Sequence, residues 1–589
     1  MNDRASSSSD ASPPIGRRAF ARSRAAREPT VRHIARAMPA NDARGDEFDL
    51  PKSCDVLIVG TALPQAVLAA AIARRGERVV CLDAGTSYGD AFGAFAATTP
   101  ARGLFASDAI DGENAWETFG TCVDAKTGRV DETASRRLRR SANEDANAPA
   151  RGYSIDLNAP RLALGADGFV ETLVRSGAHK YLEFKAIERT FVYADGVARA
   201  VASNRSDVFK DRGLSGGEKR ALMRFLKAVH VEAMRDATGR RRSGKSGEET
   251  NVAVGAPGSE WGGDEFQTTK DDDDAEGLRV ENGETMDAFL TRHGLSASLR
   301  AAVTYALALQ TRADCAAATA LEDLKVYILS VAKYGPQTGA CLIPVYGAGD
   351  IPQAFCRVGA VDGATYVLRQ GVRELDASTT ISAAISTGGQ EIRARKFIVP
   401  APERSSGPLL VHAVCILDAP LVAEYGQMLV VFPPLSAADA QTAVIRALQV
   451  GSHTGCCPEG KYLLYLSTVV DDVNVDPYAG LNAALDVLVR RGEVSSTASA
   501  FGADVEKPEV LWGTMYKRRC GHLDDIECSS SNVAYCPGPD ELATFEGALR
   551  AAERAYKALF GDDQEMFPLT EGEPKETTGD DDMDAMLED

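Results

Sequence analysis

The stretch CDVLIVGTALPQAVLAAAIARRGERVVCLDA, residues 54–84, decides the fold of this chain. It opens on the apolar run 54–60, which ends in glycine and has the length and composition of a buried strand. Pro64 suits the first turn of a helix, and the alanine-rich sequence that follows stops at Gly76. A second apolar run at 78–84 completes a β-α-β unit. We therefore predict an α/β protein with a Rossmann-type, FAD/NAD(P)-binding-like domain.

The turn after the first strand departs from the dinucleotide fingerprint G-x-G-x-x-G. Gly60 supplies the tight turn, but Ala62 and Gln65 stand at the second and third glycine positions. Those glycines let the pyrophosphate approach the backbone and let the helix pack closely on the strand. Asp83 lies where a ribose-binding carboxylate would be, and a turn residue at a strand end is the alternative. We expect the fold without a bound cofactor.

Composition and charge exclude several classes of protein. The 589 residues are 44% hydrophobic and 25% charged, as in globular proteins, so a wholly disordered chain is excluded. The net charge of −19 argues against a nucleic-acid binder that works by overall basic charge. The segments 1–36, 264–276 and 571–589 together carry −9 of this charge. About half of the acidic excess therefore lies in segments that we expect to be disordered.

Cysteine and histidine spacing predicts neither a metal site nor a disulfide framework. The twelve cysteines form no C-x-x-C pair, and no Cys/His cluster has zinc spacing. Cys54, Cys81 and Cys341 lie inside apolar runs, which favours buried, reduced thiols in an intracellular protein. No apolar run reaches the length of about 18 residues that a transmembrane helix needs. We interpret the three histidines on or beside predicted helices as packing or surface residues: His179, His230 and His293.

Composition shifts predict the organisation of the chain. The first 50 residues are rich in Ser, Ala and Arg, which is typical of a disordered extension and also of a targeting segment. We expect five segments: the extension at 1–50, the first α/β part at 51–200, a helical domain at 201–318 with a disordered insert at 236–284, the second α/β part at 319–562, and a disordered acidic tail at 563–589.

Periodicity predicts several further elements. The helices are expected at 161–177, 206–230, 285–293 and 296–310, and a strand-like run is expected at 184–193. The helix at 206–230 is amphipathic, with apolar residues at spacings i, i+3, i+4 and i+7: Leu222, Phe225, Leu226 and Val229.

Two short motifs match nucleotide-binding patterns without the right context. GRRRSGKS at 239–246 fits the P-loop pattern but follows a helix end and not a buried strand. LSGGEK at 214–219 looks like the signature loop of transport ATPases, in which the P-loop comes first. We interpret both as chance matches.

Three blocks of sequence resemble the Rab escort protein and Rab GDP-dissociation inhibitor family. They are DVLIVGTALPQAVLAAAIARRGERVVCLDAGTSYGD at 55–90, the block 153–193 that begins YSIDLNAP, and VYGAGDIPQAFCRVGAVDGATYVLRQGV at 345–372. Three more blocks look like the escort branch: 206–226, 505–519 and 530–540. The resemblance implies a discontinuous α/β domain that has lost its cofactor, with an inserted helical domain and an escort-type C-terminal region.

What the resemblance implies is a non-catalytic chaperone of Rab GTPases. Such a protein binds GDP-bound Rab, before and after prenylation, and presents it to the α/β heterodimer of Rab geranylgeranyltransferase as component A. It then delivers Rab with its geranylgeranyl lipid to membranes, so a cytosolic location with transient membrane contact is expected. The alternatives are a Rab GDP-dissociation inhibitor and, from another class, a flavin-dependent oxidoreductase on the same fold.

The resemblance also implies a Rab-binding platform. Its residues match Tyr88, Asp350, Arg357, Thr365 and Val367. Asp350 stands where the family usually has glutamate, and Val367 where it often has methionine. A turn and helix start is the structural alternative for Asp350.

A second implied site would dock the prenyltransferase on the helical domain. The matching residues are Phe289 and Arg300, and Phe289 as helix core is the alternative. The lipid is expected between helices of the same domain, near the apolar face of the helix at 206–230.

Overall fold

The computed structural model describes most of the chain. The described residues are 50–97, 117–119, 152–202, 204–243, 278–335, 338–375, 382–401, 407–472, 474–491, 498–525 and 532–568. The predicted extension at 1–49 lies outside them.

The predicted β-α-β unit is the centre of a parallel sheet. Strand β1 (Val56–Val59), helix α1 (Leu63–Arg74) and strand β2 (Val79–Asp83) follow one another, and β1 pairs with β2 in parallel. Gly60 ends the strand at a φ of +88°, a backbone conformation that glycine adopts without strain. Pro64 lies in the first turn of α1, as predicted. The Rossmann-type fold is therefore confirmed.

Distant segments complete the five-stranded sheet. Its order is β11-β2-β1-β15-β23, and every pairing is parallel. The added strands are β11 (Thr365–Leu368), β15 (Lys396–Pro400) and β23 (Val533–Cys536). Since parallel neighbours need long connections, the chain leaves and re-enters this sheet several times.

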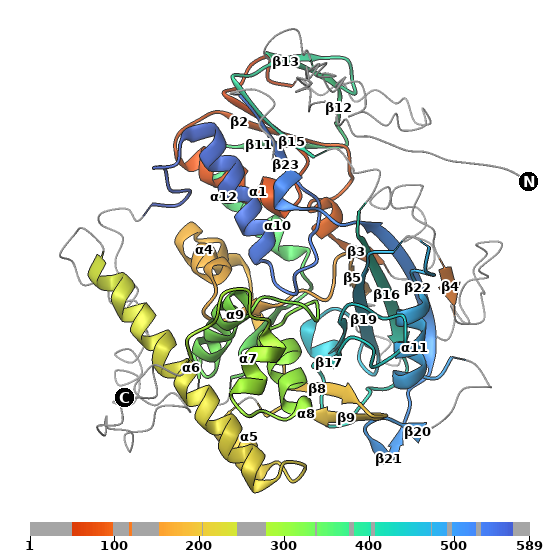
Figure 1. The fold of residues 1–589 in the computed structure, drawn as a ribbon. Helices are drawn as coiled ribbons and strands as arrows, with labels where there is room; N and C mark the ends of the chain where they lie inside the picture. The colour runs from red at the N-terminus through yellow and green to blue at the C-terminus, as the bar shows by residue number, and fades with distance from the viewer. Residues whose placement is uncertain are drawn as a thin grey trace, which may run out of the picture.

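Helices cover one face of the parallel sheet, and a small antiparallel sheet covers the other. α1, α10 (Asp350–Val361) and α12 (Glu546–Phe560) share one apolar core and lie together in Figure 1. α1 and α10 approach closely: a Cβ at Gly359 would lie 3.3 Å from the Cα of Ala70. The opposite face packs on β12 (Val372–Leu375), β13 (Ala383–Ser386) and β14 (Glu391–Arg393).

A mixed eight-stranded sheet forms the second layer of the molecule. Its order is β4-β22-β16-β19-β18-β17-β8-β9, and only β17 and β8 pair in parallel. The strands are β4 (Glu117–Phe119), β8 (Arg189–Ala194), β9 (Val197–Ala200), β16 (Leu409–Leu417), β17 (Met428–Phe432), β18 (Ile445–Gly451), β19 (Tyr462–Val470) and β22 (Val510–Arg519).

Both faces of this sheet are buried. Along β16, Ala413 and Cys415 enter one core while Val414 and Ile416 enter another, because successive side chains point to opposite faces. Helix α11 (Ala479–Leu488) packs on the first face, and the helical layer packs on the second. β16 is therefore apolar except at His412, which is buried too, unlike a strand with one wet face.

The helical layer is longer than predicted. The helix expected at 206–230 is two helices, α5 (Arg205–Lys210) and α6 (Gly216–Ser243), and α6 runs into the segment 236–243 that we expected to be disordered. α7 (Met286–Arg292), α8 (Ala297–Ala301) and the π-helical turn η4 (Ala302–Leu307) match the other two expected helices. α9 (Ala317–Ser330) packs on α6 and α7. The boundary expected at 318 is therefore wrong, because it would cut α9 from its own core.

The ATPase-like motifs have structural roles in α6. Ser215 and Glu218 form a capping box: the Ser215 amide donates to Glu218 Oε2 (3.0 Å) and the Glu218 amide donates to Ser215 Oγ (3.3 Å). The P-loop match overlaps α6 over 239–243, and its remaining residues lie outside the described part. A helix at its start contradicts a phosphate-binding loop.

Two other expectations need correction. Only the second half of the helix expected at 161–177 is helical, as α4 (Gly168–Ser176), because the earlier part pairs as strand β6 (Ala163–Leu164). The run 184–193 is two strands, β7 (Phe184–Ala186) and β8, which belong to different sheets. Smaller elements that complete the description are η1 (Asp90–Phe92), β3 (Ala94–Ala97), β5 (Tyr153–Asp156), η2 (Ala178–Tyr181), β10 (Cys341–Pro344), η5 (Ser452–Thr454), β20 (Ala498–Ser499), β21 (Gly502–Glu506) and η6 (Leu523–Asp525).

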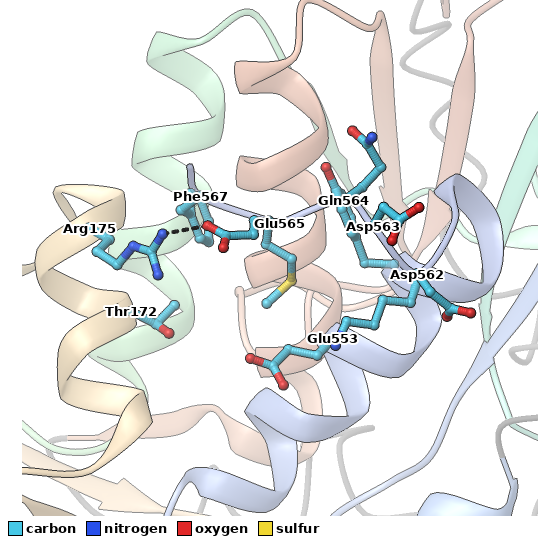
Figure 2. A pocket seen from close by; sticks show the side chains of 11 residues that line it. Thr172, Arg175, Glu553, Asp562, Asp563, Gln564, Glu565 and Phe567 are labelled. Atoms are coloured by element: carbon cyan, nitrogen blue, oxygen red, sulfur yellow. Dashed lines mark hydrogen bonds and ion pairs between the residues drawn. The ribbon is translucent and has the colours of Figure 1, made fainter. Parts of the chain in front are cut away.

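The C-terminal strap, defined as residues 561–568, is ordered and not part of a disordered tail. Met566 and Phe567 are buried in the core shared by α1, α10 and α12. Figure 2 shows the strap crossing between α12 and α4, where Glu565 Oε2 accepts from Arg175 Nη2 at 2.7 Å. A hollow of about 380 Å³ lies beneath it, with Thr172 and Glu553 in its wall. The order therefore continues five residues past the expected start of the tail at 563.

Cysteine packing agrees with the prediction of buried free thiols. Cys54, Cys81 and Cys341 are buried, and every cysteine in the described ranges is free. Burial raises the pKa of the Cys341 thiol to about 12, so it stays protonated and unreactive near neutral pH. Within these same ranges we find no cluster of candidate metal ligands and no helix that combines the length and apolarity needed to cross a bilayer.

Candidate protein-binding site

Helix α10 presents the polar face on which the predicted site depends. Ile351, Phe355 and Val358 point into the core against α1, whereas Gln353 and Arg357 are exposed. This is the periodicity of a helix with one buried side. Asp350 begins the helix, so the turn and helix-start alternative for it holds.

The turn before α10 is held by a buried carboxylate. Asp156, at the end of β5, accepts hydrogen bonds from the amides of Ala348 (2.9 Å) and Gly349 (3.3 Å). Burial raises the pKa of Asp156 to about 7, while the two amide donors oppose that rise. A Cβ at Gly347 would lie 2.6 Å from Asp156 Oδ1, and one at Gly349 would lie 2.3 Å from the Ala94 amide nitrogen. The glycines of VYGAGD therefore allow the carboxylate and a neighbouring strand to fix the start of α10.

Asp350 and Arg357 lie two helical turns apart on the same side of α10. Burial raises the pKa of Asp350, which accepts a hydrogen bond from Gln353 Nε2 at 3.3 Å. The Arg357 guanidinium lies over the ring of Tyr181 at 4.3 Å from the centroid, a cation–π contact. This contact orients the guanidinium while leaving the side chain exposed. The arrangement suits recognition of a polar protein surface.

Thr365 and Val367 face a different side of the molecule. They lie on β11, the edge strand of the parallel sheet, paired with Val80 and Leu82 of β2. Val367 packs into the core on the face opposite α10, and Thr365 points the same way because side chains alternate along a strand. The structure therefore brings Asp350 and Arg357 together and places Thr365 and Val367 around the sheet edge from them.

Tyr88 lies in the loop after β2, at the end of the sheet where α10 begins. Its ring packs edge-on against Tyr366 of β11 with centroids 6.1 Å apart, and burial raises its pKa. The loop is fixed by the Gly89 amide, which donates to the Thr61 hydroxyl at 3.0 Å. The loop thus connects the turn before α1, through Gly89, with the edge strand, through Tyr88.

The turn that would hold a dinucleotide is closed. Thr61, Ala62 and Gln65 are all buried at the amino end of α1, where a pyrophosphate would need open amides. The Thr61 hydroxyl donates to the Asp83 carboxylate, which is therefore engaged as a strand-end turn residue. The side chains present do not fit a bound dinucleotide.

The residues predicted to dock a prenyltransferase lie on neighbouring helices. Phe289 of α7 is fully buried, with its ring edge-on to Phe225 at 6.1 Å, so the helix-core alternative is confirmed. Arg300 of α8 forms an ion pair with Asp287 at 2.6 Å. In this packing the Phe289 ring is not accessible to a partner. Docking by Phe289 and Arg300 stays a prediction.

The apolar face expected near the lipid is also part of this core. Its residues are all buried in the cluster that contains Phe289: Leu222, Phe225, Leu226 and Val229. Core packing accounts for all of them, and a lipid site between these helices stays a prediction.

Three residues beside α10 were not predicted from the sequence. Asp156, Tyr181 and Tyr346 gain their roles from contacts with segments that lie far away in the chain. The local signal for Asp156 is its place as the acid that ends the strand sequence YSID. Nothing local distinguishes Tyr181 and Tyr346 from other tyrosines.

Comparisons with known proteins agree with this architecture. The sequence model of the family described as "GDP dissociation inhibitor" matches residues 133–239 and 264–502, more than half of the chain. The chain is 26% identical to Rab escort protein 1 of Arabidopsis thaliana, over 91% of this chain and 98% of that protein. It is 27% identical to the Rab proteins geranylgeranyltransferase component A of Drosophila melanogaster, over 71% and 75%. The solved structure of a Rab GDI from Plasmodium falciparum has the same fold, with a TM-score of 0.57 at 17% identity, covering 87% of this chain and 99% of that one.

Proposed function

The chain belongs to the GDP dissociation inhibitor family, and on that premise we propose that it is an escort protein for Rab GTPases. It binds GDP-bound Rab, presents it to the Rab geranylgeranyltransferase heterodimer, and delivers the prenylated product to membranes from the cytosol. Relatives named for the escort or component A role match across most of the chain, which favours this branch over the inhibitor branch.

The observation that carries the proposal is the exposed side of α10. Asp350 and Arg357 are set on one face of a helix whose start is fixed by Asp156, and the Arg357 guanidinium is oriented by Tyr181. A rigid helix with a pre-oriented arginine reduces the entropy lost when a partner binds. Arginines in such settings are frequent hot spots of protein interfaces.

The proposed role is accessory and not catalytic. The enzyme partner supplies the transfer chemistry, and this chain supplies a binding surface for its substrate. The docking of that enzyme on α7 and α8 is part of the proposal. Of the predicted pair, Phe289 and Arg300, solvent reaches Arg300, which forms an ion pair with Asp287.

Prenylation of unmodified Rab by the purified heterodimer, with and without this chain, tests the proposal directly. We expect lipid transfer only when the chain is present. Arg357→Glu should reduce Rab affinity by roughly tenfold or more, as charge reversal at an interface hot spot does. Arg373→Glu is the matched control, since Arg373 is also exposed but lies on β12, across the parallel sheet from α10.

The two rival functions give different results. A Rab GDP-dissociation inhibitor would bind prenylated Rab without supporting prenylation of unmodified Rab. A flavin-dependent oxidoreductase would purify with bound flavin and its visible absorbance. The buried Thr61, Ala62 and Gln65 in the turn before α1 disfavour the flavin rival.

A further inference from the structure

Tyr346 adopts a backbone conformation that its side chain disfavours. Its φ is +69°, in the left-handed region where a bulky residue is strained. Strain of this kind persists only where surrounding contacts enforce it, and it concentrates at functional sites.

The contacts that enforce this conformation come from two other segments. The Tyr346 amide donates to the Thr454 carbonyl at 2.7 Å, and the Tyr346 carbonyl accepts from Ser154 Oγ at 2.8 Å. The ring rests on Gly455, where a Cβ would lie 2.5 Å from two ring carbons. Both backbone groups and one face of the ring are therefore held in place.

The ring is nevertheless exposed. The relative exposure of Tyr346 is 55%, among the highest of the large apolar side chains in the described ranges. A tyrosine held rigidly on the surface loses little side-chain entropy when it becomes buried in an interface. Tyrosine is also enriched among interface hot spots.

The position of Tyr346 joins it to the α10 face. Pro344 at the end of β10 pairs with Phe184 at the start of β7, so Tyr346 after β10 and Tyr181 before β7 emerge at the same end of this strand pair. Tyr181 lies under Arg357. Tyr346 therefore lies just before Asp350 in the chain, at the end of the strand pair from which Tyr181 reaches Arg357.

We propose that Tyr346 is an aromatic anchor of the GTPase-binding surface, held ready by strain at the amino end of α10. The inference rests on the proposed function and extends its surface beyond the residues that the resemblance implies. The occupant of this extension is the same GDP-bound GTPase that meets Arg357, because Tyr346 emerges at the same end of the β10–β7 pair as Tyr181, the residue that orients Arg357.

The first test removes the ring without disturbing the backbone. Tyr346→Gly accepts the positive φ freely, so it should fold at least as stably as the wild type while its affinity for GDP-bound Rab falls by roughly tenfold. Leu435→Gly is the matched control: Leu435 has a φ of +65° and is 65% exposed, but it lies in the loop after β17, away from α10. Its affinity should equal that of the wild type.

The second test displaces the ring without altering Tyr346. Gly455→Ala forces its new Cβ into the ring, whereas Gly460→Ala has the same backbone strain, with a φ of +70° against +71°, and meets nothing within 4 Å. The two variants share the backbone strain of alanine at a positive φ, so any effect of strain alone is the same in both. Gly455→Ala should weaken Rab binding more than Gly460→Ala does.

The outcomes separate the inference from the proposed function. Wild-type protein that binds no Rab would refute the proposed function itself. Binding that Arg357→Glu weakens, but that Tyr346→Gly and Gly455→Ala leave equal to their controls, would overturn the Tyr346 inference alone.

Discussion

Replacing Phe567 by alanine should destabilise helix α10, although the two lie more than 200 residues apart in the sequence. Phe567 lies in the C-terminal strap and is only 4% exposed. Its ring faces Phe355 of α10 with centroids 6.5 Å apart, and the Arg74 guanidinium of α1 lies 5.4 Å from its centroid. The strap therefore packs directly behind the helix that carries Arg357.

The expected magnitude follows from these contacts. A buried Phe→Ala substitution destabilises by about 3–5 kcal/mol, and we take about 3 kcal/mol because a strap near a chain end can partly collapse into the space. At about 1.4 kcal/mol for each factor of ten, local opening should become roughly a hundred times more frequent. The lost cation–π contact with Arg74 accounts for about 0.5–2 kcal/mol of this.

Native-state hydrogen exchange measures this opening helix by helix. Amides of α1 and α10 should exchange roughly a hundredfold faster in Phe567→Ala, while amides of β16 in the mixed sheet should not change. Phe209→Ala is the control, because Arg205 lies over that ring at 5.8 Å but the side chain is 61% exposed. It should accelerate exchange in neither helix.

Exchange of the α10 amides at the wild-type rate in Phe567→Ala would show that the strap does not stabilise this helix. In that case the strap would cover the hydrophobic surface of the helices without adding to their stability. A weakened affinity for Rab without faster exchange would also contradict the prediction, since the expected functional effect passes through the stability of α10.

Three further predictions concern other parts of the site. Gly349→Ala should destabilise the protein by about 2 kcal/mol or more and weaken Rab binding, because its Cβ would lie 2.3 Å from the Ala94 nitrogen. Gly538→Ala is the control, since its Cβ would meet nothing within 4 Å. Thermal melts of both variants check this. Burial raises the pKa of Asp156 from 3.8 to about 7. Because the folded protein holds this proton more tightly than the unfolded chain, the group's contribution to stability is complete below about pH 4 and is lost as the pH rises through 7. Asp156→Asn should remove that part of the pH dependence, up to about 4 kcal/mol, in paired unfolding measurements from pH 4 to 8. Phe289→Ala should destabilise by about 3–5 kcal/mol, as a fully buried ring does; a loss of transferase binding, with Rab binding kept, would be needed to support its docking role.

Much of the fold could be predicted because its signals are local. The apolar runs at β1 and β2, Pro64 and Gly76 lie within one stretch of the chain and obey rules that need no distant partner. The same holds for β15, whose sequence KFIVP is a short apolar run of strand length. The helix at 206–230 was only partly right, because the capping box at Ser215 begins a new helix within the pattern.

The candidate site was predicted in residue type but not in arrangement. Resemblance pointed to Asp350, Arg357, Thr365 and Val367 as one platform. Pairing of β11 with β2 turns the last two toward the face opposite α10, where Val367 packs into a core and Thr365 is exposed. Strand alternation determines that the two point the same way, but only the sheet order decides which face that is.

The sequence by itself determined the β-α-β unit, the degenerate fingerprint at Ala62 and Gln65, and the family. Each of these depends on residue identities at short spacings, where backbone geometry leaves few choices. Only the tertiary structure decided that Phe289 is core, that Phe567 of the strap is buried, and that Tyr346 before α10 is strained and exposed. These depend on contacts between segments far apart in the chain, and burial and strain are properties of such contacts and not of any residue alone.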